Sequence, residues 1–178
     1  MSEKIDLEIV TPKGRALTAQ VDEVTAPSVN GEFGVMPGHI PLLAALRTGI
    51  VTYRAGGDTK SCAVGSGTAE AGPDKLLLLV DAFVEKDNVD PVLCHKELSE
   101  AQADYDKLAA KDSVAGAEVD KRRVLVEKIN WLCTQLELYG EAPLATIRLL
   151  EDLGVRDNQD EAHSEEANQD APKPDDAS

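Results

Sequence analysis

The sequence predicts an all-β N-terminal sandwich followed by an α-helical hairpin, which makes two small domains, and then a disordered acidic tail. Two changes of pattern carry this prediction. Short alternating apolar segments between turn residues fill the first part of the chain, up to Asp90-Pro91. After that point apolar residues recur with helical spacing. We therefore place the sandwich at 1–88 and the antiparallel helical hairpin at 89–140.

The strands are predicted from a period of two and from turns. Apolar residues alternate with polar ones over 5–9 and again over 17–21, as in half-buried strands. The segments 50–54 and 60–64 flank Ala-Gly-Gly-Asp, which predicts a hairpin. The run Leu76–Val80 is apolar throughout, so we expect a strand that is covered on both faces.

Between these strands, the segment Gly31–Leu46 reads GEFGVMPGHIPLLAAL and combines glycines, prolines and one histidine with apolar residues. Pro37 and Pro41 fix φ and remove two backbone donors, and the glycines permit positive φ. This composition predicts a rigid, shaped loop and not a strand or a helix. Two interpretations stay open: the loop caps one end of the sandwich, or it carries binding residues.

Two amphipathic helices are predicted after Asp90-Pro91, where Asp suits the N-cap and Pro the first helical position. Their apolar residues each step by 4, 3, 4 and 3 positions. The first stripe is Cys94, Leu98, Ala101, Tyr105 and Leu108, and the second is Leu125, Ile129, Leu132, Leu136 and Tyr139. Residues 111–116 interrupt the pattern, and Gly140 is a plausible end of the second helix.

Beyond this hairpin, residues 141–156 include a segment that predicts a short third helix. Residues 157–178 hold eight acids and one base, with no Val, Leu, Ile or aromatic residue. Such a segment cannot bury enough apolar surface to offset the entropy of ordering, so we expect a disordered acidic tail.

Composition excludes several classes of function. A formal net charge of −15 argues against a nucleic-acid binder, because phosphate contacts need clustered Lys and Arg. The apolar runs are far shorter than the ~20 residues that span a bilayer. The three cysteines form no CxxC pair, and we interpret them as small buried side chains. Gly65-Ser66-Gly67 lacks the ending of a phosphate-binding loop and predicts a bulge or tight turn. We therefore expect no catalysis, no cofactor and no metal site.

The segment GEFGVMPGHIPLL resembles the GExG(I/V)xPGHxPLL signature of the epsilon subunit of F-type ATP synthases. The resemblance covers roughly residues 4–139. It includes further similar segments on both sides of the signature: Val10–Gly14, Val21–Pro27, Leu46–Val51, Gly65–Glu70, Leu76–Ala82 and Val89-Asp90. The order of sandwich and hairpin in that family agrees with the order predicted above.

This resemblance implies a non-catalytic central-stalk (rotor) subunit of a proton-transporting synthase, which couples rotation of the c-ring to ATP synthesis. It implies that the sandwich binds the gamma subunit and the c-ring. The hairpin either folds on the sandwich or extends toward the alpha and beta subunits, where it inhibits ATP hydrolysis. The absence of a transit-like N-terminus favours a peripheral location on the cytoplasmic side of a bacterial plasma membrane, with no direct membrane insertion.

Two groups of residues follow from the family's pattern. The loop expected near gamma and the c-ring contains Glu32, Phe33, Gly38, His39 and Pro41. We expect Glu32 to make polar contacts with the ring and His39 to shape the gamma-facing surface. The second group is a basic patch on the second helix, which either is a solvated face or pairs with acidic loops of the catalytic subunits: Lys121, Arg122, Arg123 and Lys128.

One departure from the family concerns nucleotide binding. Some bacterial members carry an (I/L)DxxRA motif at the start of the hairpin and bind ATP there. This chain retains Asp90 but has Leu93 at the Arg position and Cys94 at the Ala position, so a phosphate lacks its bidentate partner. We expect no tight ATP binding. Two alternatives also remain: an interaction module with a helical arm in an unrelated complex, and a small hydrolase that uses His39.

Overall fold

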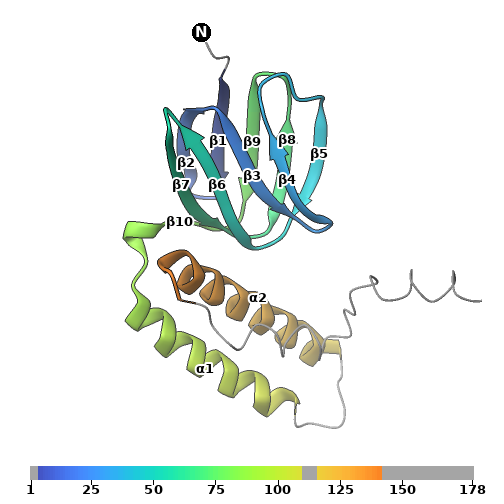
Figure 1. The fold of residues 1–178 in the computed structure, drawn as a ribbon. Coiled ribbons are helices and arrows are strands. Elements are labelled where there is room, and N and C mark those ends of the chain that lie inside the picture. Colours follow the sequence, from blue (N-terminus) through green and yellow to red (C-terminus); the bar gives the residue numbers. More distant parts are fainter. Residues whose placement is uncertain (1–3, 110–115, 142–178) are drawn as a thin grey trace, which may run out of the picture. The chain divides into compact units, whose positions relative to one another are not determined.

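The computed structural model describes residues 4–109 and 116–141 (Figure 1). The short helix predicted after Glu141 and the acidic tail at 157–178 lie outside the described residues. The described strands are β1 (Ile5–Thr11), β2 (Gly14–Val21), β3 (Glu23–Ser28), β4 (Gly31–Val35), β5 (Leu42–Leu46), β6 (Gly49–Ala55), β7 (Asp58–Val64), β8 (Gly67–Ala71), β9 (Lys75–Val80) and β10 (Phe83–Glu85). A 3₁₀ turn, η1 (Lys86–Asn88), and two helices, α1 (Pro91–Ala109) and α2 (Gly116–Tyr139), follow.

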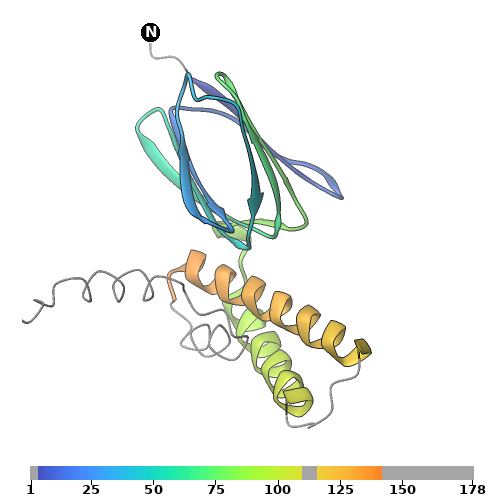
Figure 2. The same cartoon turned by 90° about the vertical axis from the view of Figure 1, so that its right-hand side faces the viewer.

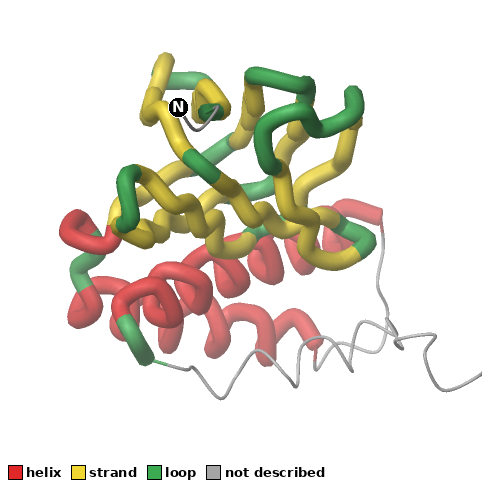
Figure 3. The backbone as a smooth tube through the Cα atoms, turned by 45° about the horizontal axis from the view of Figure 1, so that its top comes forward, coloured by secondary structure: helices red, strands yellow, loops and turns green. Residues whose placement is uncertain are grey.

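The strands form a two-layered sandwich, as predicted (Figure 2). They follow the hydrogen-bonded order β10-β7-β6-β3-β5-β8-β9-β1-β2, with β4 added to β3. The path passes from one layer to the other through a single bridge between Ser28 and Leu46. Figure 3 shows the strands in yellow and the two helices, which follow them in the chain, in red.

Alternation explains which residues of β1 fill the core. Ile5, Leu7 and Ile9 are fully buried, whereas Asp6 is exposed. The buried residues pack with the inward side chains of β9, which pairs with β1 in parallel. The core is almost entirely aliphatic, as the low aromatic content requires.

The expectation that Leu76–Val80 is covered on both faces is wrong. Leu76 and Leu78 are fully buried, but Leu79 is 48% exposed on the opposite face. The strand therefore buries one face only, and its other face presents leucine side chains to the outside. An unbroken apolar run does not tell whether one or both faces of a strand are covered by the same chain, because an uncovered apolar face and a covered one have the same sequence pattern.

The expectation that Gly31–Leu46 is a loop throughout is also wrong. Its first five residues form β4, which pairs with β3, and its last five form β5, which pairs with β8. Only residues 36–41 connect the two strands without regular structure. The prolines and the left-handed glycine Gly38 lie in this connection, and Gly31 stands at the first position of β4.

Both predicted helices are confirmed, and so are the signals at their ends. The Asp90 carboxylate accepts a hydrogen bond from the Leu93 amide at 3.1 Å and caps α1. At the end of α2, Gly140 takes a φ of +117°, and the amides of Gly140 and Glu141 both donate to the Leu136 carbonyl. The helices pack antiparallel through the predicted stripes, with Leu98, Ile129, Leu132 and Leu136 buried.

Candidate partner-binding surface

Residues Met36-Pro37-Gly38-His39 form a tight turn at the end of β4. The His39 amide donates to the Met36 carbonyl at 3.1 Å, and Gly38 has a φ of +82°. Pro at the second position and a left-handed Gly at the third are the features of a type II turn. The Gly38 amide also donates to the Pro73 carbonyl at 2.7 Å, which ties the turn to the neighbouring β8–β9 connection.

The His39 side chain forms a hydrogen bond to the backbone directly after this turn. Its Nδ1 lies 2.6 Å from the Ile40 carbonyl oxygen, and because a carbonyl only accepts, Nδ1 carries the proton in this contact. The ring is half-buried, and no acid is hydrogen-bonded to it among the described residues. The arrangement orients the Ile40 backbone and lacks the acid partner that a catalytic histidine needs.

The side chains that leave the turn are apolar and exposed. Ile40 is 75% exposed, Leu43 at the start of β5 is 73% exposed, and Met36 is also exposed. Gly38 and Pro41 lie at the surface between them. A rigid backbone thus holds aliphatic side chains in water, which is the arrangement expected of a docking site.

A second turn, at the opposite end of β4, directly precedes the strand residues Gly31 and Glu32. The Ser28 hydroxyl donates to the Gly31 carbonyl at 2.6 Å and accepts from the Asn30 amide at 3.2 Å. Val29, at the tip, is 61% exposed. The sequence analysis missed Val29, because one apolar residue between polar ones shows no period. Its only available signal is its place beside the Asn-Gly turn.

The structure does not bring all of the predicted loop residues together. Glu32 is exposed near the start of β4, whereas Gly38, His39 and Pro41 lie beyond its end. A strand rises ~3.3 Å per residue, so the two groups stand on the order of 13 Å or more apart. Phe33 is half-buried and packs against the core, so it supports the strand from inside.

The layer that contains β5, β8, β9 and β1 presents an outer apolar face, which we define as Leu43, Ala45, Leu77 and Leu79. Strand register places these residues in two adjacent rows: Leu43 pairs with Glu70, which pairs with Leu77, and Ala45 pairs with Thr68, which pairs with Leu79. All four project away from the core side chains that alternate with them. The exposed Ile40 precedes β5 by two residues in the chain.

Charged side chains border the outer apolar face. Glu8 pairs with Arg15 at 2.7 Å and with Lys75 at 3.0 Å. The hydrogen bond from Lys75, helped by the charges of Arg15 and Lys75, lowers the pKa of Glu8 despite a partial opposing effect of burial. The face therefore has apolar side chains on β5 and β9, the exposed Thr68 and Glu70 of β8 between them, and the ion pairs of Glu8 at its border.

The four residues of the predicted basic patch on α2 differ in their contacts in the folded hairpin. Arg122 Nη2 donates to the Leu108 carbonyl of α1 at 2.6 Å, and Lys128 pairs with Glu97 of α1 at 3.4 Å. Arg123 pairs with Glu127 along its own helix at 3.3 Å. Lys121 is exposed.

The thiols are buried, as the sequence analysis predicted. Cys62, Cys94 and Cys133 are all buried. Burial raises the pKa of Cys62 to about 12 and also raises the pKa of Cys94, so both remain protonated and poorly nucleophilic near neutral pH. Within residues 4–109 and 116–141, neither helix has an apolar stretch long enough to cross a bilayer.

Comparison with known proteins identifies the family. Residues 4–86 match the model for "ATP synthase, Delta/Epsilon chain, beta-sandwich domain". The chain is 39% identical over 112 residues to ATP synthase epsilon chain 2 of Syntrophotalea carbinolica, which covers 63% of this chain and 81% of that protein. It is 45% identical over 92 residues to the epsilon chain of Syntrophobacter fumaroxidans, with 52% and 69% covered. The chain belongs to the ATP synthase epsilon chain family.

A solved structure shares the fold. A chain in the cryo-EM structure of the Euglena gracilis mitochondrial ATP synthase (OSCP, F1 and c-ring) matches with a TM-score of 0.59 and 22% identity. The match covers 72% of this chain and 79% of that one. This match supports the predicted fold, in which a sandwich is followed by helices.

Proposed function

We propose that this chain is a non-catalytic rotor subunit of the central stalk of an F-type ATP synthase, and that its sandwich holds the gamma subunit and the c-ring together. Family membership supports the assignment to the synthase. The observation that carries the binding role is the exposure of two large apolar side chains, Ile40 directly after the rigid turn and Leu43 in β5. A subunit that keeps its partners through a full rotation needs apolar contacts of this kind together with polar ones.

The two ends of β4 suggest two contacts. We assign the turn at Val29 and Glu32 to polar and apolar contact with the ring, and the turn at Gly38, His39 and Pro41 to the side that faces gamma. Their separation along β4 favours two surfaces over one. In this assignment, the complex is peripheral on the cytoplasmic side of a bacterial plasma membrane and is driven by protons.

A binding experiment tests this role. Leu43→Asp places a charge in the outer apolar face and should weaken capture of the gamma subunit at least about tenfold, since a buried unpaired charge is costly. Val92→Asp is the matched control, because Val92 is 78% exposed on α1, away from that face. Equal binding by both variants contradicts the role of the face. Failure of the wild-type chain to bind gamma supports the alternative of an unrelated complex.

We also propose that the helical hairpin inhibits ATP hydrolysis when it extends toward the alpha and beta subunits. Removal of residues 91–178 should then raise ATP hydrolysis by the assembled enzyme and leave gamma binding intact. Unchanged hydrolysis rejects the inhibitory role. His39→Ala distinguishes the hydrolase alternative: a loss of turnover in the isolated chain supports that alternative, whereas our proposal predicts an effect on assembly alone.

A further inference from the structure

One hydrogen bond joins α2 to the last turn of α1. Arg122 Nη2 donates to the Leu108 carbonyl oxygen at 2.6 Å. Leu108 is the penultimate residue of α1, so its carbonyl is one of the last four that have no acceptor role inside the helix. The end of a helix also carries partial negative charge, which favours a cation. Arg122, from the facing helix α2, therefore caps a carbonyl at the C-terminal end of α1.

The neighbouring arginine shows that this contact is specific to one side of α2. Arg123 is 80% exposed at its side chain and pairs with Glu127, one turn further along the same helix. The Arg122 side chain is half-buried, and its Nε is inaccessible to solvent. Successive residues differ by ~100° around a helix, so the two adjacent cations serve different surfaces. Arg122 bonds to the other helix of the hairpin, whereas Arg123 bonds to a residue of its own helix.

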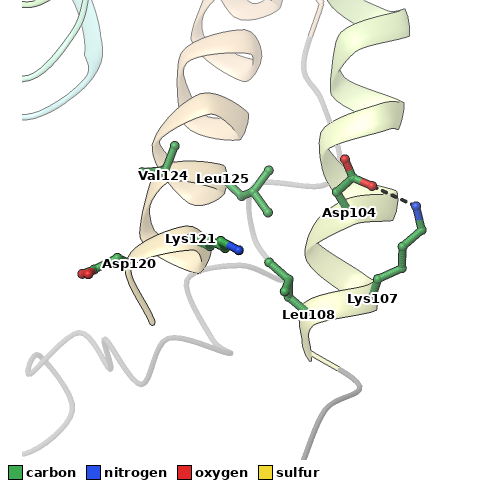
Figure 4. Close-up of a pocket in the computed structure, with 7 residues that line it drawn as sticks. All are labelled: Asp104, Lys107, Leu108, Asp120, Lys121, Val124 and Leu125. Atoms are coloured by element: carbon green, nitrogen blue, oxygen red, sulfur yellow. Dashed lines mark hydrogen bonds and ion pairs between the residues drawn. The ribbon is translucent and has the colours of Figure 1, made fainter. Parts of the chain in front are cut away.

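Apolar packing between the helices is concentrated away from this contact. Ile129, Leu132 and Leu136, nearer the end of α2, are buried. At the Arg122 end, a groove of about 540 Å³ lies between the helices, with Leu108 and Leu125 exposed to it (Figure 4). Asp104, on the same groove, is paired with Lys107 at 2.8 Å. The bond from Arg122 thus joins the helices beside this groove, about one turn from the buried Val126 and Tyr105.

We propose that Arg122 is the clasp of the folded hairpin: α2 separates from α1 only after the bond from Nη2 to the Leu108 carbonyl breaks. The contact is charge-assisted and partly buried, so its loss should increase the open fraction of the hairpin roughly tenfold. The clasp itself is independent of any partner. The further claim, that this contact controls how readily the hairpin extends, rests on the proposed function.

Amide hydrogen exchange on the full-length chain tests the clasp directly. Arg122→Met keeps the aliphatic stem but removes the donor, and α2 amides between residues 119 and 136 should then exchange roughly tenfold faster. Arg123→Met is the matched control and should leave these rates unchanged. Amides of the sandwich provide an internal standard, and quenching of Trp131, the single tryptophan, which lines a cavity between α1 and α2, gives a second readout.

Arg122→Lys keeps a cationic donor for the same single carbonyl and should restore most of the protection. This variant separates the clasp from a general loss of folding in Arg122→Met. Equal exchange in the Met variants of Arg122 and Arg123 overturns the proposal. Failure of Arg122→Lys to improve on Arg122→Met also overturns it, because a donated hydrogen bond is then not what holds the helices.

A second arm distinguishes this proposal from the inhibitory role of the hairpin. In the assembled enzyme, a looser clasp should increase inhibition of ATP hydrolysis if the extended hairpin inhibits. If exchange accelerates in Arg122→Met but hydrolysis is unchanged, the clasp stands and the inhibitory function fails. If exchange is unchanged, the clasp fails whatever the hydrolysis rate.

Discussion

Gly65 and Gly67, at the corner between β7 and β8, lie against backbone and side chain that leave no room for a methyl group. A Cβ built on Gly67 would stand 2.0 Å from the Leu79 carbonyl oxygen, and one on Gly65 would stand 1.7 Å from Asp81 Oδ1. The Ser66 hydroxyl donates to the same Asp81 carboxylate at 2.9 Å. The sequence motif Gly-Ser-Gly is therefore explained by strand proximity, as a tight turn and not as a phosphate loop.

Gly67→Ala should destabilise the sandwich by about 1–3 kcal/mol, because the Leu79 backbone cannot move away without disturbing β9. Urea unfolding followed by circular dichroism measures this change. Gly34→Ala is the matched control: it also lies in a strand, but an added Cβ there meets no atom within 4 Å. Equal stability of the two variants would show that the corner relaxes more readily than this contact indicates.

The ion pairs of Glu8 predict a pH dependence. The pKa of Glu8 is lowered from its ordinary value of 4.5, chiefly by the hydrogen bond from Lys75, so its contribution to stability is present above pH 4.5. The contribution is lost as the pH falls through the lowered pKa of the folded protein. Glu8→Gln should therefore reduce the urea midpoint at pH 7, and its difference from wild type should shrink as the pH falls below 4.5.

Glu70→Gln, on the neighbouring strand β8, provides the comparison for Glu8, since no ion pair of Glu70 is found in the described part of the chain. A Glu8→Gln effect that is the same at pH 7 and at low pH would attribute the loss to packing and not to charge.

Residue-level predictions from sequence succeeded where backbone chemistry is local. Pro37-Gly38 predicts a turn because Pro fixes φ at one position and Gly permits the positive φ that the next position needs. The exposure of Val29 and the contact of Arg122 were not predicted, since exposure at a turn tip and a bond to a carbonyl 14 positions away both depend on the folded arrangement. Charge alone grouped Arg122 with Arg123, although their contacts differ.

At the level of elements, α1 illustrates a start signal that sequence and structure share. The Asp90 carboxylate caps the Leu93 amide, and Cys94 donates its amide to the Asp90 carbonyl at 3.0 Å. Asp90→Ala should destabilise the helix by about 1 kcal/mol, because the capping acceptor is lost. Thermal unfolding monitored at α-helical wavelengths provides the measurement.

Asp90→Ser retains a capping oxygen and should recover most of that stability. If Ser and Ala reduce the stability of the helix equally, the carboxylate acts through its charge, as expected of an acid near a helix start, and not through the cap.

Strand β9 marks the limit of prediction for elements. Its position and length follow from the apolar run and the flanking turns, but its pairing does not. β9 pairs in parallel with β1, about 70 positions earlier in the chain, and this contact has no local signature. Which leucines of β9 are buried is likewise not predictable from the run itself, because it depends on which face of the strand packs against the core.

For the whole molecule, the fold class and the family could be predicted from sequence, because the PGHxPLL segment is specific and each domain has its own period. The structure adds which faces remain uncovered. The outer apolar face and the two ends of β4 became visible only when register placed distant residues in one row. Sequence reasoning had proposed one loop, and the folded chain presents two turns.

The isolated chain should not bind ATP tightly, because Leu93 replaces the arginine of the family motif and the Asp90 carboxylate is engaged in capping α1. A ligand with a dissociation constant of about 1 μM, present at about 1 mM, would stabilise the protein by about 4 kcal/mol. Thermal unfolding with and without ATP should thus give the same Tm, with sodium triphosphate as the ionic control. An increase of several degrees with ATP alone would contradict this expectation.

The length of β4 has a consequence for how this surface changes over evolution. Glu32 and His39 have no common hydrogen-bond partner among the described residues and lie toward opposite ends of β4. Substitutions that far apart contribute free energies that add, as a double-mutant cycle would record with a coupling near zero. One end of the strand can therefore acquire new residues to match a diverging neighbour, while the other end keeps its own affinity unaltered.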